Sequence, residues 1–306
     1  MRRKFRLNAK NFMNFFSTSS FLLFFIVSSL CARERITLLD VDIVVRKDAS
    51  ILVRESITVF CERKEIIRGI VRDIPTRYSG FLGTVYEAPI MVQSITMDGN
   101  TIPYVINNAV DGIIMTIKDD QKLLPIGLHT FVIEYIVNWQ IAFFDETAEN
   151  FWASVPGISL LKNLGNRYHS GQATADSFEE SHEELYWNAV GTGCRFIVER
   201  ARVRVILPIG ISSNSIRVAG YRGEYEERDI LGFNATVDAQ GVAHFETTYS
   251  LPPRNGFTIV VGWPPGFIEK PSWWSCFAHF VHDNPFFSFY VVFTFGAYSI
   301  GNYCSC

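Results

Sequence analysis

The chain has 306 residues, a formal net charge of −3 and a pI near 6.1, and 14% of its residues are aromatic. This length suits one large domain or two small ones. Nucleic-acid binding requires a basic domain or patch. Because the charge is balanced and slightly acidic, we predict no nucleic-acid partner.

The amino-terminal segment, residues 1–32, has the pattern of an export signal. It begins with a cluster of arginines and lysines, continues with an apolar centre at 21–27, and ends in small residues up to Ala32. This is the three-part order of a secretory signal, and the apolar centre is short for a membrane span of about 20 residues. We therefore predict cleavage of this signal peptide near Ala32 and export of the domain that begins at residue 33.

From residue 33 to about 270, apolar residues recur at every second position, which is typical of half-buried strands. The clearest segments are 36–45, 51–61, 89–100, 112–118, 127–139, 200–208 and 242–266, the last divided by a Pro-Arg-Asn-Gly turn. Short strands separated by turn signals predict an all-β fold, and short connections between them favour antiparallel pairing. The predicted architecture is an antiparallel β-sandwich domain outside the cytoplasm, followed by a C-terminal transmembrane helix.

One region interrupts this pattern. Residues 143–181 show no sustained alternation and predict a long loop insertion, a kind of segment that is usually functional or disordered.

Two cysteines, Cys61 and Cys194, lie in the body of the domain. An oxidising compartment would allow a disulfide between them, and two buried free thiols are the alternative.

The carboxyl-terminal segment is predicted to cross a membrane. No charged residue follows Asp283, and residues 285–303 are mostly apolar or aromatic. This is about the length of one span. We assign the transmembrane segment to residues 284–304.

One stretch, "GIVRDIP", mixes an arginine and an aspartate with strand-forming apolar residues. Glu55 is the one charge on the apolar face of segment 51–61, and a buried carboxylate needs a partner. Arg68 and Arg72 are candidates, because a guanidinium can donate two parallel hydrogen bonds to a carboxylate. We predict a charged clamp in which Arg72 binds Glu55 or Glu184. A ligand site at Arg72 is the alternative.

The neighbours of this arginine have predicted roles as well. Pro75 is expected to end the strand, and Asp73 is expected to face the amide of an adjacent loop. In a second motif, "EELYWN", the candidate residues are Glu184, Tyr186, Trp187 and Asn188. Adjacent strand residues point to opposite faces, so its two glutamates do not form a ready-made acid and base pair.

Recognised catalytic and metal-binding patterns are missing from the sequence. The histidines lack the paired spacing of zinc proteases, and there is no Gly-x-Ser-x-Gly nucleophile motif and no glycine-rich phosphate loop. We predict no catalytic residue, no cofactor and no metal site.

The stretches "GIVRDIPTRY" (69–78) and "EELYWNAVGTG" (183–193), in this order and with the strands around them, resemble the predicted membrane-protein family named domain of unknown function 2207. The resemblance covers roughly residues 34–268. It implies a bacterial or archaeal membrane protein with a signal, an extracytoplasmic β-rich domain and membrane spans. It implies no activity, so no catalytic residue is carried over.

The chain departs from the family pattern in three places. It stops at the first span after the domain, as a truncated product would. Its connection before "EELYWN" is longer, and Cys194 follows "GTG" where such proteins tend to have tryptophan.

Two functions are consistent with these features. The first is a non-enzymatic binding module anchored in the cell membrane, whose partner is an envelope protein or polymer. The second is an envelope hydrolase that uses Glu55, Asp73 and Glu184. A polar cleft lined by all three acids would favour the hydrolase, and acids paired within a filled sandwich would favour the module.

Overall fold

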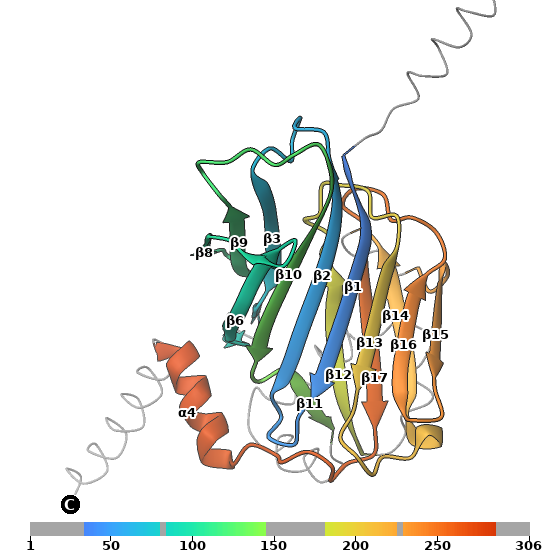
Figure 1. Cartoon of the computed structure of the whole chain (residues 1–306). Coiled ribbons are helices and arrows are strands. Elements are labelled where there is room, and N and C mark those ends of the chain that lie inside the picture. Colours follow the sequence, from blue (N-terminus) through green and yellow to red (C-terminus); the bar gives the residue numbers. More distant parts are fainter. Residues whose placement is uncertain (1–33, 80–83, 145–180, 225–228, 286–306) are drawn as a thin grey trace, which may run out of the picture.

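The computed structural model describes residues 34–79, 84–144, 181–224 and 229–285, which are mostly β-strand (Figure 1). In chain order the strands are β1 (Arg35–Val45), β2 (Ile51–Cys61), β3 (Gly69–Pro75), β4 (Arg77–Ser79), β5 (Val85–Glu87), β6 (Ile90–Met97), β7 (Asn100–Thr101), β8 (Tyr104–Asn108), β9 (Gly112–Lys118), β10 (Gly127–Val137), β11 (Ile141–Phe144), β12 (His182–Val190), β13 (Ala201–Ile206), β14 (Arg217–Gly223), β15 (Phe233–Val237), β16 (Val242–Thr247) and β17 (Gly256–Trp263). A short 3-10 turn, η3 (Ser213–Ser215), precedes β14, and helix α4 (Trp273–Asp283) follows β17. The prediction of a β-rich domain is confirmed for these residues.

Several predicted segments fall outside the described ranges. They are the export signal (1–32), most of the long insertion (145–180 of 143–181) and nearly all of the transmembrane segment (286–304 of 284–304). These assignments stay predictions. At the edge of the insertion, residues 143 and 144 belong to strand β11.

The strands form one large sheet and three smaller ones. The large sheet has the order β15-β16-β13-β1-β2-β10-β6-β7, and the others are β11-β12-β17-β14, β3-β9-β8 and β4-β5. Figure 1 shows the long strands β10, β2, β1 and β13 side by side, with β12 and β17 in a layer behind them. Side chains from these layers fill the space between them as one hydrophobic core.

The core follows from the period-two pattern of the long strands. Val41 and Ile43 on β1, and Phe131, Ile133 and Tyr135 on β10, have no solvent-exposed surface. Burying one such side chain stabilises a fold by about 1.5–3 kcal/mol. The alternation therefore determines which face of each strand turns inward, because a slip of one residue would expose the whole set.

The prediction of antiparallel pairing is wrong at one place. β1 pairs with β2 antiparallel, but its other neighbour, β13, runs parallel to it, with Leu39 opposite Ala201 and Val44 opposite Ile206. On the exposed face of this seam, Arg204 donates two hydrogen bonds to Asp42, at 2.6 and 2.7 Å. Short connections do not predict this pair, because β1 and β13 are far apart in the chain and parallel strands need a long crossover.

Helix α4 was not predicted. The side-chain oxygen of Ser272 caps its first turn by accepting from the amide of Ser275 at 3.1 Å, and Pro285 follows its end. Such a cap satisfies one of the free amides of a helix start. In the part of the chain that the structure describes, no helix is long and apolar enough to cross a membrane.

Candidate functional site

The buried carboxylate of Glu55 lies in the interior of the molecule, and Arg72 binds it. Glu55 on β2 is 0% exposed, and the side chain of Arg72 on β3 is 11% exposed. Arg72 Nε donates to Glu55 Oε2 at 2.6 Å, and Arg72 Nη2 donates to Oε1 at 2.8 Å. The hydroxyl of Tyr135 on β10 donates to the same Oε1 at 2.7 Å. Of the two acids considered as partners for Arg72, the structure shows Glu55.

The same guanidinium also binds two main-chain carbonyls, one on its own strand and one on β12. Arg72 Nη2 donates to the carbonyl of Ala189 on β12 at 3.1 Å, and Nη1 donates to the carbonyl of Asp73 at 3.0 Å. One side chain therefore connects the large sheet with the sheets that contain β3 and β12. Burial acts to lower the pKa of Arg72, but the Glu55 carboxylate outweighs it and holds that pKa above its usual value. These contacts make Arg72 a structural crosslink.

The residues beside Arg72 have separate positions. β3 ends at Pro75, as predicted. Asp73 points to the opposite face, beside Gly193 in the loop after β12, but among the described residues no hydrogen bond links its carboxylate to a loop amide. Burial and then the charge of Asp111 raise the pKa of Asp73. Arg68 is exposed and does not contact Glu55, so it is not the clamp residue.

The "EELYWN" motif forms most of β12. Trp187 is buried, with its ring centroid 6.3 Å from that of Tyr135, and Asn188 lies on the other face of the strand. Glu184 is buried with its Oε2 3.7 Å from His182 Nε2. The carbonyl of Tyr186 accepts from Gln140 Nε2 at 2.9 Å. The strand itself pairs with β11 on one side and with β17 on the other.

The three acids considered for hydrolysis lie apart. Glu55 is bound to Arg72, and Asp73 faces away from that pair. Glu184 is five residues along β12 from Ala189, which contacts Arg72, so it lies about 16 Å from this point at 3.3 Å per strand residue. The arrangement is therefore not that of a glycosidase, in which two carboxylates face each other across a cleft.

One buried acid was missed by the sequence reasoning. Glu183 accepts from the indole Nε1 of Trp263 at 2.7 Å and from the amide of Gly266 at 2.9 Å. The sequence places it beside Glu184, but its partner lies 80 residues away on β17. Only the pairing of β12 with β17 brings them together.

The cysteines are separate in the structure. Cys61 and Cys194 are free. The Cys61 thiol donates to the carbonyl of Ile66 at 2.8 Å, and the Cys194 thiol donates to that of Phe196 at 3.4 Å. Burial raises the pKa of the Cys194 thiol. Of the two alternatives left open, the structure shows free thiols.

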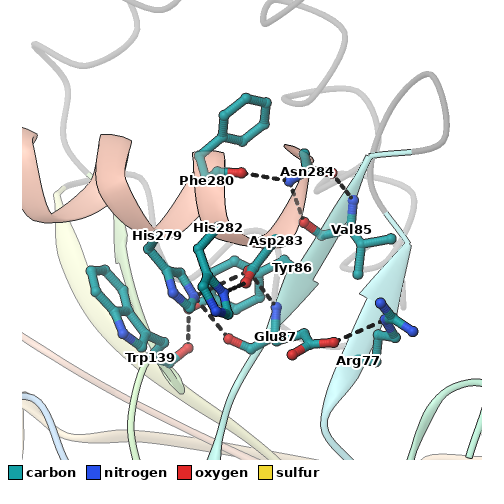
Figure 2. Close-up of polar contacts among 10 residues, drawn as sticks. All are labelled: Arg77, Val85, Tyr86, Glu87, Trp139, His279, Phe280, His282, Asp283 and Asn284. Atoms are coloured by element: carbon teal, nitrogen blue, oxygen red, sulfur yellow. Dashed lines mark hydrogen bonds and ion pairs between the residues drawn. The ribbon is translucent and has the colours of Figure 1, made fainter. Parts of the chain in front are cut away.

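Helix α4 is fixed to the hairpin of β4 and β5 by its carboxyl-terminal end (Figure 2). Asn284 accepts from the amide of Val85 at 2.6 Å and donates to its carbonyl at 2.8 Å. Asp283 accepts from the amide of Glu87 at 2.9 Å. Two side chains of the helix end thus pair with the hairpin main chain as a neighbouring strand would.

A histidine completes this junction. His279 Nε2 lies 2.8 Å from the carbonyl oxygen of Glu87, to which it donates, and 3.3 Å from Asp283 Oδ2. Its ring stacks on Trp139, with centroids 4.3 Å apart and planes within 4°. Tyr86 meets the same ring edge-on at 5.4 Å and donates its hydroxyl to the Trp139 carbonyl. Burial raises the pKa of Tyr86, so this hydroxyl stays a donor.

The junction was missed because its partners come from three separate parts of the chain. Local signals for the helix existed: Ser272 before an uninterrupted run, and Pro285 after it, are typical of a helix start and stop.

Among the described residues, no group of three or more histidine, cysteine, aspartate or glutamate side chains is placed to hold a metal ion.

Comparison with solved structures gives distant likenesses, of which three are described. Native leukotriene A4 hydrolase from Saccharomyces cerevisiae is 10% identical, with a TM-score of 0.41 over 75% of this chain and 29% of that chain. An M1 zinc metallopeptidase from Deinococcus radiodurans is 12% identical, with a TM-score of 0.36 over 74% of this chain and 42% of that chain. A putative protease from Parabacteroides distasonis is 10% identical, with a TM-score of 0.37 over 76% of this chain and 40% of that chain. At these TM-scores the likeness supports no inference about activity.

Comparison with curated proteins gives no match. A family model described as the N-terminal domain of a predicted membrane protein (DUF2207) matches residues 35–157. This segment contains β1 to β11 and the "GIVRDIPTRY" motif, whereas "EELYWN" lies beyond it. The resemblance predicted from the sequence is thus confirmed over residues 35–157, where the chain matches the N-terminal domain of the DUF2207 predicted membrane proteins.

Proposed function

We propose that this protein is a membrane-anchored, extracytoplasmic binding module of the cell envelope, without catalytic activity of its own. The family description supports association with a membrane. The predicted export signal and transmembrane segment support the anchoring and the side. The hydrolase alternative gains no support from the acids. Glu55 is occupied by Arg72 and Tyr135, Asp73 points to the other face of β3, and Glu184 lies farther along β12.

The observation that carries the proposal is strand β8 at the edge of the short sheet. All five of its residues are exposed, and Tyr104, Val105 and Ile106 are large apolar residues. β8 pairs with β9 on one side only, and no described strand pairs with its other side. An exposed apolar edge strand is a template for an added strand from a partner.

The hydrogen-bond pattern shows which groups are available to a partner. Lys118 donates its amide to the carbonyl of Pro103, and Ala109 donates to the carbonyl of Gly112. In an antiparallel pair, residues whose main-chain amide and carbonyl bind the neighbouring strand alternate with residues whose groups point away from it. Residues 103 and 109 bind β9, so the odd-numbered residues of β8 between them do so as well. The amides and carbonyls of Tyr104 and Ile106 therefore face outward. The partner is an extended segment of another envelope protein.

Photocrosslinking tests this surface. Benzoylphenylalanine replaces Tyr104, which is 43% exposed, in the full chain expressed in its native cell. As the control it replaces Tyr249, which is 71% exposed and thus at least as accessible. We expect an adduct at position 104 and none at 249. Ile106→Pro removes the outward amide without breaking a β8–β9 bond, and should abolish the adduct, whereas Ile106→Ala should retain it. An adduct that survives Ile106→Pro, or equal adducts at both positions, would reject strand addition.

A thiol-labelling experiment tests the side of the membrane. Ile209 is 97% exposed, so Ile209→Cys gives an accessible thiol. In intact cells this variant should react with a membrane-impermeant maleimide beyond the level of the parent chain. Labelling only after permeabilisation would place the domain in the cytoplasm and refute the topology.

A further inference from the structure

One face of helix α4 is aromatic and exposed. Trp273, Trp274 and Phe277 all expose a large part of their surface. Their rings pack on one another: Trp273 stacks on Phe277 at 5.4 Å, and Trp274 meets Trp273 edge-on at 4.5 Å. Soluble proteins rarely expose contiguous apolar patches of this kind without a function.

The docked edge of the helix keeps this face turned outward. His279 and Asp283 bind the β4–β5 hairpin (Figure 2). At about 100° per residue, Phe277 lies roughly 160° around the helix from His279, and Trp273 roughly 120° from it. The hairpin thus holds one edge of α4, and the aromatic rings project from the opposite side.

The charge pattern indicates what covers the aromatic face. From Pro271 to Cys306 the sequence contains one acidic residue, Asp283, and no lysine or arginine. The Asp283 side chain is 1% exposed. The chain that continues from α4, residues 286–306, is uncharged and largely apolar or aromatic, and its length is about that of one span. In the sequence, helix α4 with its aromatic face is therefore followed directly by the segment predicted to enter the membrane.

We propose that α4 lies in the membrane interface, with Trp273, Trp274 and Phe277 between the lipid headgroups and the start of the acyl chains. Tryptophan is enriched at this depth because its ring is apolar and its N–H is polar. Helices with an apolar aromatic face bind the interface in this way. Since α4 is hydrogen-bonded to the β4–β5 hairpin, it sets the height and tilt of the β domain above the bilayer. This inference rests on the membrane anchoring proposed above.

Quenching by brominated lipids tests the proposal. The full chain is reconstituted into phosphatidylcholine vesicles whose lipids carry bromine either near the headgroup end or near the methyl end of one acyl chain. We expect tryptophan fluorescence to be quenched more by bromine near the headgroup end. The double substitution Trp273→Phe and Trp274→Phe should remove a large share of this quenching. The indoles of Trp187 and Trp263 are buried in the β domain, and Trp139 and Trp152 stay as a background common to both proteins.

A charge substitution provides a second measurement with a matched control. Trp274 is 70% exposed and Leu231, in a loop before β15, is 71% exposed. Trp274→Glu should lower the quenching contributed by Trp273, measured as the difference from the same chain that also carries Trp273→Phe, whereas Leu231→Glu should leave this contribution unchanged. Thermal unfolding shows whether each variant keeps its fold.

The outcomes separate this inference from the proposed function. If the chain stays with the vesicles after an alkaline wash but quenching does not depend on Trp273 and Trp274, α4 is not in the interface and the anchoring stands. A second copy or another protein could instead cover both indoles. A water-soluble quencher would then quench their fluorescence less, while the brominated lipids would not quench it, and this result would also overturn the inference. A chain released by the alkaline wash would overturn both.

Discussion

Removing one partner of the Arg72–Glu55 clamp should strongly destabilise the protein. Arg72→Ala leaves the Glu55 carboxylate, which is 0% exposed, with only the Tyr135 hydroxyl as a donor among the described residues. Loss of one partner of a buried ion pair costs about 3–5 kcal/mol. In a domain of this size about 1 kcal/mol lowers the melting temperature by roughly 2–4 °C, so we expect a decrease of about 6–20 °C.

The compensating variant follows from the same contacts. Arg72→Met with Glu55→Leu removes both charges, a change that is often nearly neutral in a buried pair. It would leave the Tyr135 hydroxyl without its acceptor, at a cost of about 1–3 kcal/mol for a buried unsatisfied group. Adding Tyr135→Phe should therefore restore most of the remaining loss.

The assay is a double-mutant cycle on the full chain, with thermal unfolding followed by circular dichroism. A coupling free energy below about 0.5 kcal/mol between positions 55 and 72 is within the error of independent sites and would refute the clamp. So would an Arg72→Ala variant whose melting temperature is unchanged, which is the behaviour of a ligand-binding arginine.

Three further predictions concern single positions. Burial and then the charge of Asp111 raise the pKa of Asp73 in the folded state, so protonation of Asp73 favours folding. The protonated group contributes its full stabilisation below the usual pKa of 3.8, and this stabilisation is lost as the pH rises through the pKa of the folded state. Asp73→Asn should thus raise the melting temperature at neutral pH and have no effect well below pH 3.8, and an equal effect at both would argue against the shift. Tyr135→Phe alone should cost about 1–2 kcal/mol in denaturant unfolding, and no loss would mean that its bond to Glu55 contributes nothing. Gly69→Ala would place a Cβ 1.9 Å from the carbonyl oxygen of residue 117, whereas Gly191→Ala meets no atom closer than 3.9 Å; only the first should lower the melting temperature, by overpacking of about 1–3 kcal/mol.

The part of the fold that could be predicted from the sequence is the part determined by local pattern. Val41 and Ile43 turn inward because residues two apart share a face. The lone charge of Glu55 on such a face required a partner, and the nearby Arg72 had the matching chemistry. The choice between Glu55 and Glu184 was left open because it depends on which strands lie opposite each other across the core.

The features that could not be predicted depend on contacts between distant segments. The indole of Trp263 binds Glu183 only because β17 pairs with β12. The end of α4 is fixed by Val85 and Glu87, at sequence separations of 199 and 196 residues. The sequence pattern within each of these segments gives no indication of its partner. The aromatic run of α4 was visible, but its role depends on which side of the helix the hairpin holds.

The parallel seam between β1 and β13 has a consequence for synthesis of the chain. Asp42 and its partner Arg204 are 162 residues apart, and ribosomes add about 5–20 residues per second. The outer edge of β1 therefore waits roughly 8–32 s for its neighbour, while β2, on its other side, emerges almost at once. During that interval the half of the large sheet made of β1, β2, β10 and β6 has an open edge, which is exposed to pairing with another nascent chain. Slow elongation between residues 137 and 201 would lengthen the interval during which this edge is open.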